Sequence, residues 1–467
     1  MRVTCQLLLA CGALGLSGCQ HFEPRPISAD QNAVELETRS LRDAGLKSYV
    51  EKNLAREIGS WQRWNFEMLT LAAFYFHPSL DIARAQRDVA KAAIGTAGGR
   101  PNPTIGVTPA YSFNPPEGMS PWLPSVTFDV PIETAGKRSH RLARAGQLSD
   151  AALFNIATTA WAVRSRLRAA LLELADARQR EEVLRQQHSL QEKIVARLEE
   201  RFRAGTVSSI ELTTARIAVT KTQVESQNLQ RRAEEAMARV AESIGVPASA
   251  LNDVTIDFPS LRPADTELAS TEMRTQALHT RPDILAALAE YAASQSALQL
   301  EIAKQYPDVH LGTGYQWDQG EHKWSLGIGM ELPVLNRNQG PIAEAKAKRT
   351  EAAARFEAAQ AKALAEIDLA WASYRGAQTS LRTVESLVGA QQKQQAAVEA
   401  QFKAGAADNL EVLATQSELY AAKLLQLDAQ ARSHAGFGQL EDAIQRPFDA
   451  LSSVEENPRL VGDKRSP

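Results

Sequence analysis

The amino-acid sequence contains two copies of one unit. Residues 201–212 read RFRAGTVSSIEL and residues 401–412 read QFKAGAADNLEV, with identical residues recurring at a spacing of 200. Prolines extend the correspondence in both directions: Pro247 matches Pro447, Pro131 matches Pro333, Pro103 matches Pro307 and Pro78 matches Pro282. The spacing drifts only from 204 to 200 across the whole unit. This is an internal duplication, and both copies are expected to fold into the same unit.

Each copy has the same order of predicted elements. A first helix, two short strands, a very long helix and a last helix are expected at about 67–98, 104–131, 137–203 and 208–244, and again at about 268–304, 307–332, 341–403 and 408–445. Gly205 and Gly405 follow the long helices, as helix-ending glycines with a left-handed backbone do. Ser208 and Asp408 are suitable N-caps for the helices that follow.

The long helices exclude a compact domain. A helix of about 65 residues is about 100 Å long and needs partners along its flanks, as in coiled coils or helical barrels. The composition agrees, with 6% aromatic residues and an abundance of Ala, Glu, Gln, Leu and Arg. A cytoskeletal coiled coil would explain the helices but would leave the strands without a role.

The N-terminus has the pattern of a secretory signal. Arg2 is followed by an apolar run from Leu7 to Leu16 that is too short to span a bilayer. The run ends in Leu-Ser-Gly-Cys, which resembles the bacterial lipobox and predicts a signal peptide over 1–18 and a lipid on Cys19. The resemblance to the lipobox pattern implies the outer rather than the inner membrane, because Gln20 and not Asp follows the cysteine. The alternative is an ordinary signal followed by a chance cysteine.

Four segments alternate between larger apolar residues and small or polar ones. They lie at about 104–113 and 122–131 in the first copy and 307–317 and 322–332 in the second. Each approaches the length of a strand that crosses a bilayer at a tilt. Aromatic residues gather near the hairpin ends, at Tyr111, Phe113, Trp122, Tyr315, Trp317 and Trp324. A sheet half buried against the helices would alternate in the same way, but the lipobox favours a lipid-facing barrel.

Four strands cannot close a barrel, because bacterial outer-membrane barrels have at least eight. An open strand edge in lipid would leave backbone groups unpaired. Membrane-spanning strands therefore require several chains, each forming part of the wall.

The sequence offers no pattern that indicates catalysis or cofactor binding. The net charge of −3 gives no reason to expect nucleic-acid binding. The sequence has no HExxH, CxxC or GxSxG motif, and its eight histidines are scattered. We therefore predict no enzyme, no cofactor and no resident metal site. His310 and His322 could meet a metal in passage, although a lone histidine in a strand or loop is more often solvated.

These features together resemble the outer-membrane efflux protein family, the TolC-like channels. The resemblance rests on the duplication, the helix starts at His77-Pro78 and Arg281-Pro282, the strand starts PNPTI and YPDVH, and the G-x-x-x-x-x-E turn in both copies. It implies a mainly α fold with a small β part: a homotrimer in which twelve strands form an outer-membrane barrel and long helical hairpins form a periplasmic tunnel. It also implies a periplasmic adaptor and an inner-membrane pump of the RND type as partners.

Two segments resemble the cobalt–zinc–cadmium branch of that family. They are PIETAGKRSHRLARA at 131–145 and LPVLNRNQGPIAEAKA at 332–347. Heavy-metal cations are therefore the expected substrate. Organic compounds or a type I secretion cargo stay as alternatives, because the second segment also occurs in other branches. A non-channel periplasmic coiled-coil lipoprotein is the alternative from another functional class.

The resemblance also implies site residues. Gly205 and Gly405 would lie at the periplasmic tip turns, where adaptor hairpins dock. Glu211 and Glu411 would lie near the closed aperture, where three chains would present a ring of carboxylates. The family's second acid is replaced by Ala414, which weakens the prediction of a tight acidic gate. The alternative is that both glutamates are ordinary first-turn helix acids.

The expected domain organisation follows from these assignments. A signal peptide over 1–18 precedes a lipidated tether over 19–65. The two efflux-protein repeats occupy 66–260 and 261–447. A disordered tail is expected over 448–467.

Overall fold

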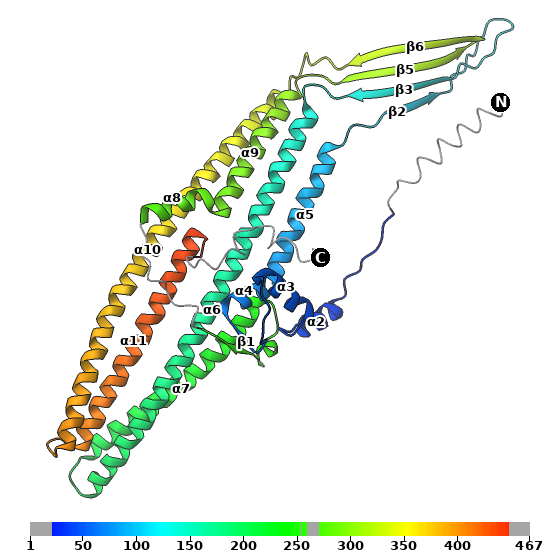
Figure 1. The fold of residues 1–467 in the computed structure, drawn as a ribbon. Helices are drawn as coiled ribbons and strands as arrows, with labels where there is room; N and C mark the ends of the chain where they lie inside the picture. Colours follow the sequence, from blue (N-terminus) through cyan, green and yellow to red (C-terminus); the bar gives the residue numbers. More distant parts are fainter. Residues whose placement is uncertain (1–20, 253, 259–269, 448–467) are drawn as a thin grey trace.

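The protein is a long helical body with a small sheet at one end (Figure 1). The structure is a computed structural model and describes residues 21–252, 254–258 and 270–447. The expected signal peptide, Cys19 and the C-terminal tail lie outside the described residues. The helical hairpins of both repeats end at the pole opposite the sheet.

Both repeats fold into the same series of elements. The first repeat contains α4 (Phe66–Phe76), α5 (Pro78–Gly98), β2 (Thr104–Thr108), β3 (Ser125–Ile132), α6 (Lys137–Arg203) and α7 (Ser209–Ile244). The second contains α8 (Ser270–Thr280), α9 (Pro282–Ala303), β5 (Val309–Asp318), β6 (Glu321–Met330), α10 (Gln339–Lys403) and α11 (Asn409–Ile444). The predicted long helices are confirmed, with 67 residues in α6 and 65 in α10.

The first helix of each repeat differs from the prediction. It is divided in two, because a proline lacks the N–H of a helix interior and disfavours helical backbone in the residue before it. His77 and Arg281 adopt extended backbone, and Pro78 and Pro282 each start a second helix. Arg281 is 2% exposed and donates to the carbonyl of Ala443 at the end of α11.

The strands form one sheet in the order β2-β3-β5-β6, with every neighbouring pair antiparallel. The pairing of β3 with β5 joins the two repeats. Strand β2 is shorter than predicted, because Pro109 follows its last residue and cannot donate a ladder hydrogen bond. Beyond it, only an isolated bridge joins Tyr111 to Trp122. Strands β2 and β6 are the free edges of the sheet within one chain.

The segment expected as a tether contains regular structure. It forms α2 (Ala29–Glu37), α3 (Ala44–Leu54) and β1 (Arg63–Trp64). Strand β1 pairs in parallel with β4 (Thr255–Ile256), which follows the short 3-10 helix η1 (Ala248–Leu251). Arg39 donates to the carbonyls of Phe76 and Gly245, both at 2.9 Å. Tertiary packing of this kind stabilises helices that are too short to persist alone. The tether role itself stays a prediction.

The main core lies in the middle of the helical body. It joins α3, α4, α6 and α7, with Leu46, Trp64, Leu69, Leu167 and Val240 fully buried or nearly so. A smaller core lies between α8, α10 and α11 around Ile367 and Leu440. The sheet and the hairpin tips lie outside both cores, at opposite ends of the molecule.

Candidate channel wall and tip turns

The sheet presents an apolar face that no other described segment of the chain covers. In β6 the side chains of Trp324, Leu326, Ile328 and Met330 are between 53% and 80% exposed. Strand pairing places Leu326 in one row with Thr313 of β5, Phe128 of β3 and Ile105 of β2. Trp324 pairs with Tyr315 of β5. Contiguous apolar surface of this kind indicates an apolar environment or a partner.

The opposite face is small and polar. Gly106, Thr127, Gly314 and Ser325 lie in one row across the four strands. In the next row toward the helices, Asp129 pairs with Gly312, and the Asp129 carboxylate accepts a hydrogen bond from Nδ1 of His310 at 2.9 Å. A sheet with one aliphatic face and one polar face can separate lipid from water.

The aromatic residues gather at the hairpin end, as predicted. Tyr111 packs edge-on against Phe113 and Trp122, with ring centroids 5.5 and 5.1 Å away. Tyr315 packs against Trp324 at 4.9 Å and its hydroxyl bonds to Nδ1 of His322 at 2.6 Å. Amphipathic rings in such a position suit a membrane–water interface. His322 therefore has a tyrosine partner, and His310 has a carboxylate partner.

The tip turns are built by the two glycines. Gly205 and Gly405 have φ of 72° and 75°, which confirms the expectation of positive φ. The amides of Thr206 and Ala406 donate back to Arg201 and Gln401, at 3.0 and 2.8 Å, so that both helices end in the same hydrogen-bonded turn. A Cβ at either glycine would meet no atom within 4 Å. Glycine is therefore favoured at both positions by the positive φ, and not because a side chain would clash with a neighbour.

The two predicted glutamates occupy equivalent first-turn positions. The amide of Glu211 donates to the Ser208 hydroxyl at 3.2 Å, and Asp408 caps α11 by accepting from the amide of Leu410 at 3.1 Å. Both Glu211 and Glu411 are exposed. Within one chain the turn geometry explains both residues as helix-start acids, and an acidic ring would need other copies.

An ion pair joins the tips of the two repeats. The guanidinium of Arg201, at the end of α6, contacts the carboxylate of Asp408, the N-cap of α11. The amide of Leu410 is the first cause that lowers the pKa of Asp408 below its usual range, and the hydrogen bond from Arg201 adds to it. This contact was not predicted, because a pairing across 207 residues leaves no local signal.

The two repeats are also joined by a buried ionic cluster. Arg164 and Arg168 of α6 both contact the Glu441 carboxylate of α11, which is 4% exposed. Arg168 also contacts Asp442 at 2.9 Å, and Trp161 donates its indole N–H to Asp442 at 3.1 Å. A Cβ at Gly438 would lie 2.9 Å from Arg168, so glycine there makes room for the guanidinium. Sequence reasoning missed this cluster as well.

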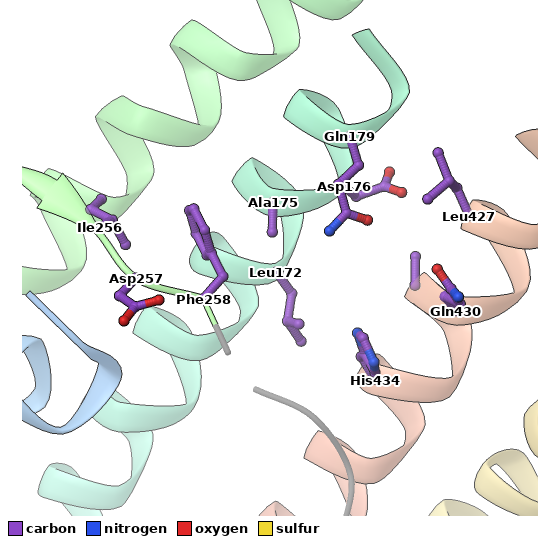
Figure 2. Close-up of a pocket in the computed structure, with 11 residues that line it drawn as sticks. Leu172, Ala175, Asp176, Gln179, Ile256, Asp257, Phe258, Leu427, Gln430 and His434 are labelled. Atoms are coloured by element: carbon purple, nitrogen blue, oxygen red, sulfur yellow. The ribbon is translucent and has the colours of Figure 1, made fainter. Parts of the chain in front are cut away.

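A side cavity of about 350 Å³ lies between α6 and α11, where the chain leaves β4 (Figure 2). Asp176 and Gln179 of α6 face Gln430 and His434 of α11, and Phe258 closes one side. Asp176 is held by Arg180 at 2.8 Å. Over the described part of the chain, no cluster of three or more metal-binding side chains occurs.

Among the helices that the structure describes, none is both long and apolar enough to cross a membrane. Exposed apolar side chains also occur on β2, β3 and β6 and in the loop after β6.

Comparison with known proteins gives one consistent family. The model of the outer membrane efflux protein family matches residues 75–246 and 273–444, which are the two halves of the duplication. The chain is 26% identical over 327 residues to the cobalt-zinc-cadmium resistance protein CzcC of Cupriavidus metallidurans, covering 68% of this chain and 76% of that protein. It is 25% identical to the pyoverdine export outer membrane protein OpmQ of Pseudomonas aeruginosa, but spans only 54% of the length of that relative.

Solved structures share the fold. The outer membrane protein VceC from Vibrio cholerae aligns with a TM-score of 0.67 at 20% identity, over 82% of this chain and 97% of that one. CusC aligns with a TM-score of 0.65 at 15% identity, over 88% and 95%. Together with the duplicated hairpins and the two-faced sheet, the match over both repeats shows that the chain belongs to the outer membrane efflux protein family and is an outer-membrane efflux channel protein.

Proposed function

We propose that three copies of the chain assemble into a continuous duct, with a barrel in the outer membrane and a helical tunnel in the periplasm. The observation that carries this proposal is the sheet, with its exposed aliphatic face, its small polar face and its two free edges, β2 and β6. In lipid the backbone groups of both edges must be paired. Pairing β6 of one copy with β2 of the next satisfies them.

The number of copies is constrained by the strand count. Each chain supplies four strands, and a barrel of at least eight needs two or more chains. Three copies, as the family resemblance implies, would give a twelve-stranded barrel. Native mass spectrometry of the detergent-purified protein tests this, with a trimer as the expected mass. A stable monomer that retains its helical content would contradict the proposal.

In this proposal the duct conducts passively. Substrate would arrive from an inner-membrane pump through a periplasmic adaptor that docks at the turns of Gly205 and Gly405. The tips are suited to docking, because they lie at the pole farthest from the sheet and are exposed. Family membership favours this channel role over a non-channel coiled-coil lipoprotein, which would not need the duplicated strands.

We further propose that Cys19 carries the lipid anchor. The four residues Leu16 to Cys19 support it, and the anchor would be secondary to the barrel. The wild-type protein should incorporate labelled palmitate, and Cys19→Ser should abolish the label. Label retained by Cys19→Ser would refute the assignment.

For the substrate we propose heavy-metal cations. The cobalt-zinc-cadmium resistance relative supports this class, and so do segments 131–145 and 332–347, which resemble the cobalt–zinc–cadmium branch of the family. The pyoverdine export relative supports organic compounds as the second candidate. Deleting the gene should lower the tolerance of the cells to cobalt, zinc or cadmium, and complementation should restore it. Unchanged metal tolerance with loss of export of an organic compound would favour the second candidate.

A further inference from the structure

An exposed apolar loop lies where the sheet meets the helices. It joins β6 to α10, and its side chains Leu332, Val334 and Leu335 are 68%, 72% and 97% exposed. The loop is not loose. The amide of Val334 donates to the carbonyl of Leu332 at 2.8 Å, and the side-chain amide of Asn338 donates to the carbonyl of Glu301 in α9 at 2.7 Å. The fold thus holds three aliphatic side chains in solvent at a fixed place.

This loop continues the apolar face of the sheet. Trp324, Leu326, Ile328 and Met330 alternate along β6, and Leu332 is the next position in that alternation. A surface that meets hydrocarbon along β6 therefore extends to the loop without a polar interruption. The end of that surface marks the level at which hydrocarbon gives way to headgroups.

Arginines without carboxylate partners surround the same level. Arg100 lies between α5 and β2, Arg138 lies in the first turn of α6, and Arg337 lies between the apolar loop and α10. All three are exposed, and no ion pair involves them within the described residues. Arg138 donates its Nε to the carbonyl of Gly98 at 2.7 Å, which fixes the guanidinium at this junction.

The neighbouring acids are already neutralised. Asp308 is bound by Lys137 at 2.7 Å, Glu133 by Arg141, and Glu301 by Lys304 at 2.7 Å. Glu331 is exposed and forms no ion pair with the described residues. The junction therefore presents mainly free positive charge.

The other rim of the sheet has a different chemistry. The hairpin end carries the aromatic rings, and its Lys323 is bound by Asp318. The helix end instead carries aliphatic side chains beside arginines that form no ion pair with the described residues. A patch in which aliphatic side chains lie beside arginines is typical of surfaces that insert into the boundary of an anionic membrane.

We propose that the junction binds the anionic phospholipid headgroups of the membrane leaflet on the helical side. Leu332, Val334 and Leu335 enter the acyl boundary, while Arg100, Arg138 and Arg337 contact lipid phosphates. The proposal rests on the proposed membrane insertion of the sheet. A protein partner fits less well, because the apolar loop is continuous with the lipid-facing side of β6. The junction thereby fixes the depth of the barrel.

The test uses the full chain reconstituted into phosphatidylcholine vesicles that contain phosphatidylglycerol. Native mass spectrometry after mild extraction measures how strongly phosphatidylglycerol is retained over phosphatidylcholine. Arg138→Gln/Arg337→Gln should lower this preference by about fivefold for each arginine, which corresponds to about 1 kcal/mol per cation. Arg138→Lys/Arg337→Lys should keep it. Arg185→Gln, which removes one positive charge from the exposed part of α6, is the matched control for each single arginine substitution.

An unchanged preference in the double variant would overturn the proposal. If that variant does not assemble, Arg337→Gln decides, since no hydrogen bond of the Arg337 side chain is seen within the described residues. Excess inorganic phosphate should not displace the lipid, and complete displacement would indicate a free anion site instead. Conductance of the same preparations is recorded separately. Variants that conduct but lose the lipid preference support both proposals, whereas a non-conducting wild type would contradict the channel alone.

Discussion

Gly205 and Gly405 hold their turns through backbone conformation alone. Replacing either with Val puts a β-branched residue at a φ near 72° or 75°, at a cost of about 1–2 kcal/mol. That cost is small against the stability expected of the proposed trimer, so we expect the trimer to persist while binding of the proposed adaptor weakens. Surface plasmon resonance with the adaptor measures the effect. Gly376→Val is the control, because Gly376 lies near the middle of α10 and a Cβ added there would meet no atom within 4 Å. Trimer loss without a selective docking defect would refute the assignment.

The Arg201–Asp408 contact should depend on pH in one direction. The folded-state pKa of Asp408 is lowered, so the contact is present above the ordinary aspartate value of about 3.9 and is lost as pH falls through the lowered pKa. Spin labels on the two tips should therefore separate only below about pH 4. Asp408→Asn should leave the labels separated at every pH. A separation that begins at neutral pH in the wild type would contradict the pairing.

The helical elements were the most predictable part of the molecule. Their bounds follow from turn residues such as Gly205 and Ser208, and α6 was predicted over its observed length. The break at Pro78 carried a local signal, since the residue before a proline avoids helical backbone. Pro109 likewise signalled the early end of β2.

The contacts between elements could not be predicted. Arg168 and Glu441 are separated by 273 residues, and nothing in either local sequence indicates the pairing. The same holds for Arg39, which docks the N-terminal helices on the carbonyls of Phe76 and Gly245. In the candidate site, the tip glycines were predictable because they recur in both copies. The Arg201–Asp408 pair was not, because Arg201 aligns with Gln401.

The seam between α6 and α11 should contribute strongly to stability. Glu441→Gln would leave two buried guanidinium groups, those of Arg164 and Arg168, without full compensation. Removing one partner of a buried ionic cluster costs about 3 kcal/mol. Thermal unfolding followed by circular dichroism should show a clearly lower midpoint. Glu182→Gln, which breaks an exposed pair on α6, should change it little. Equal effects of the two substitutions would show that the cluster is not important for stability.

In the proposed trimer, Glu211 and Glu411 would act together. Three copies would place six carboxylates near the tips, and such a ring would raise the local cation concentration until salt shortens the Debye length below about 10 Å. We expect Glu211→Gln/Glu411→Gln to keep the trimer and to lose cation preference at low salt. The reversal potential across a salt gradient measures this. An unchanged reversal potential would show that the glutamates serve only to start their helices.

A channel role requires the chain to form a water-filled duct through a bilayer. Conductance of the purified trimer in planar bilayers tests this most directly, for the wild type and for Arg201→Ala, which removes the ion pair between the tips. We predict discrete conductance steps, with a higher open fraction in Arg201→Ala. Trimers of both proteins that insert into the bilayer and never conduct would contradict the account.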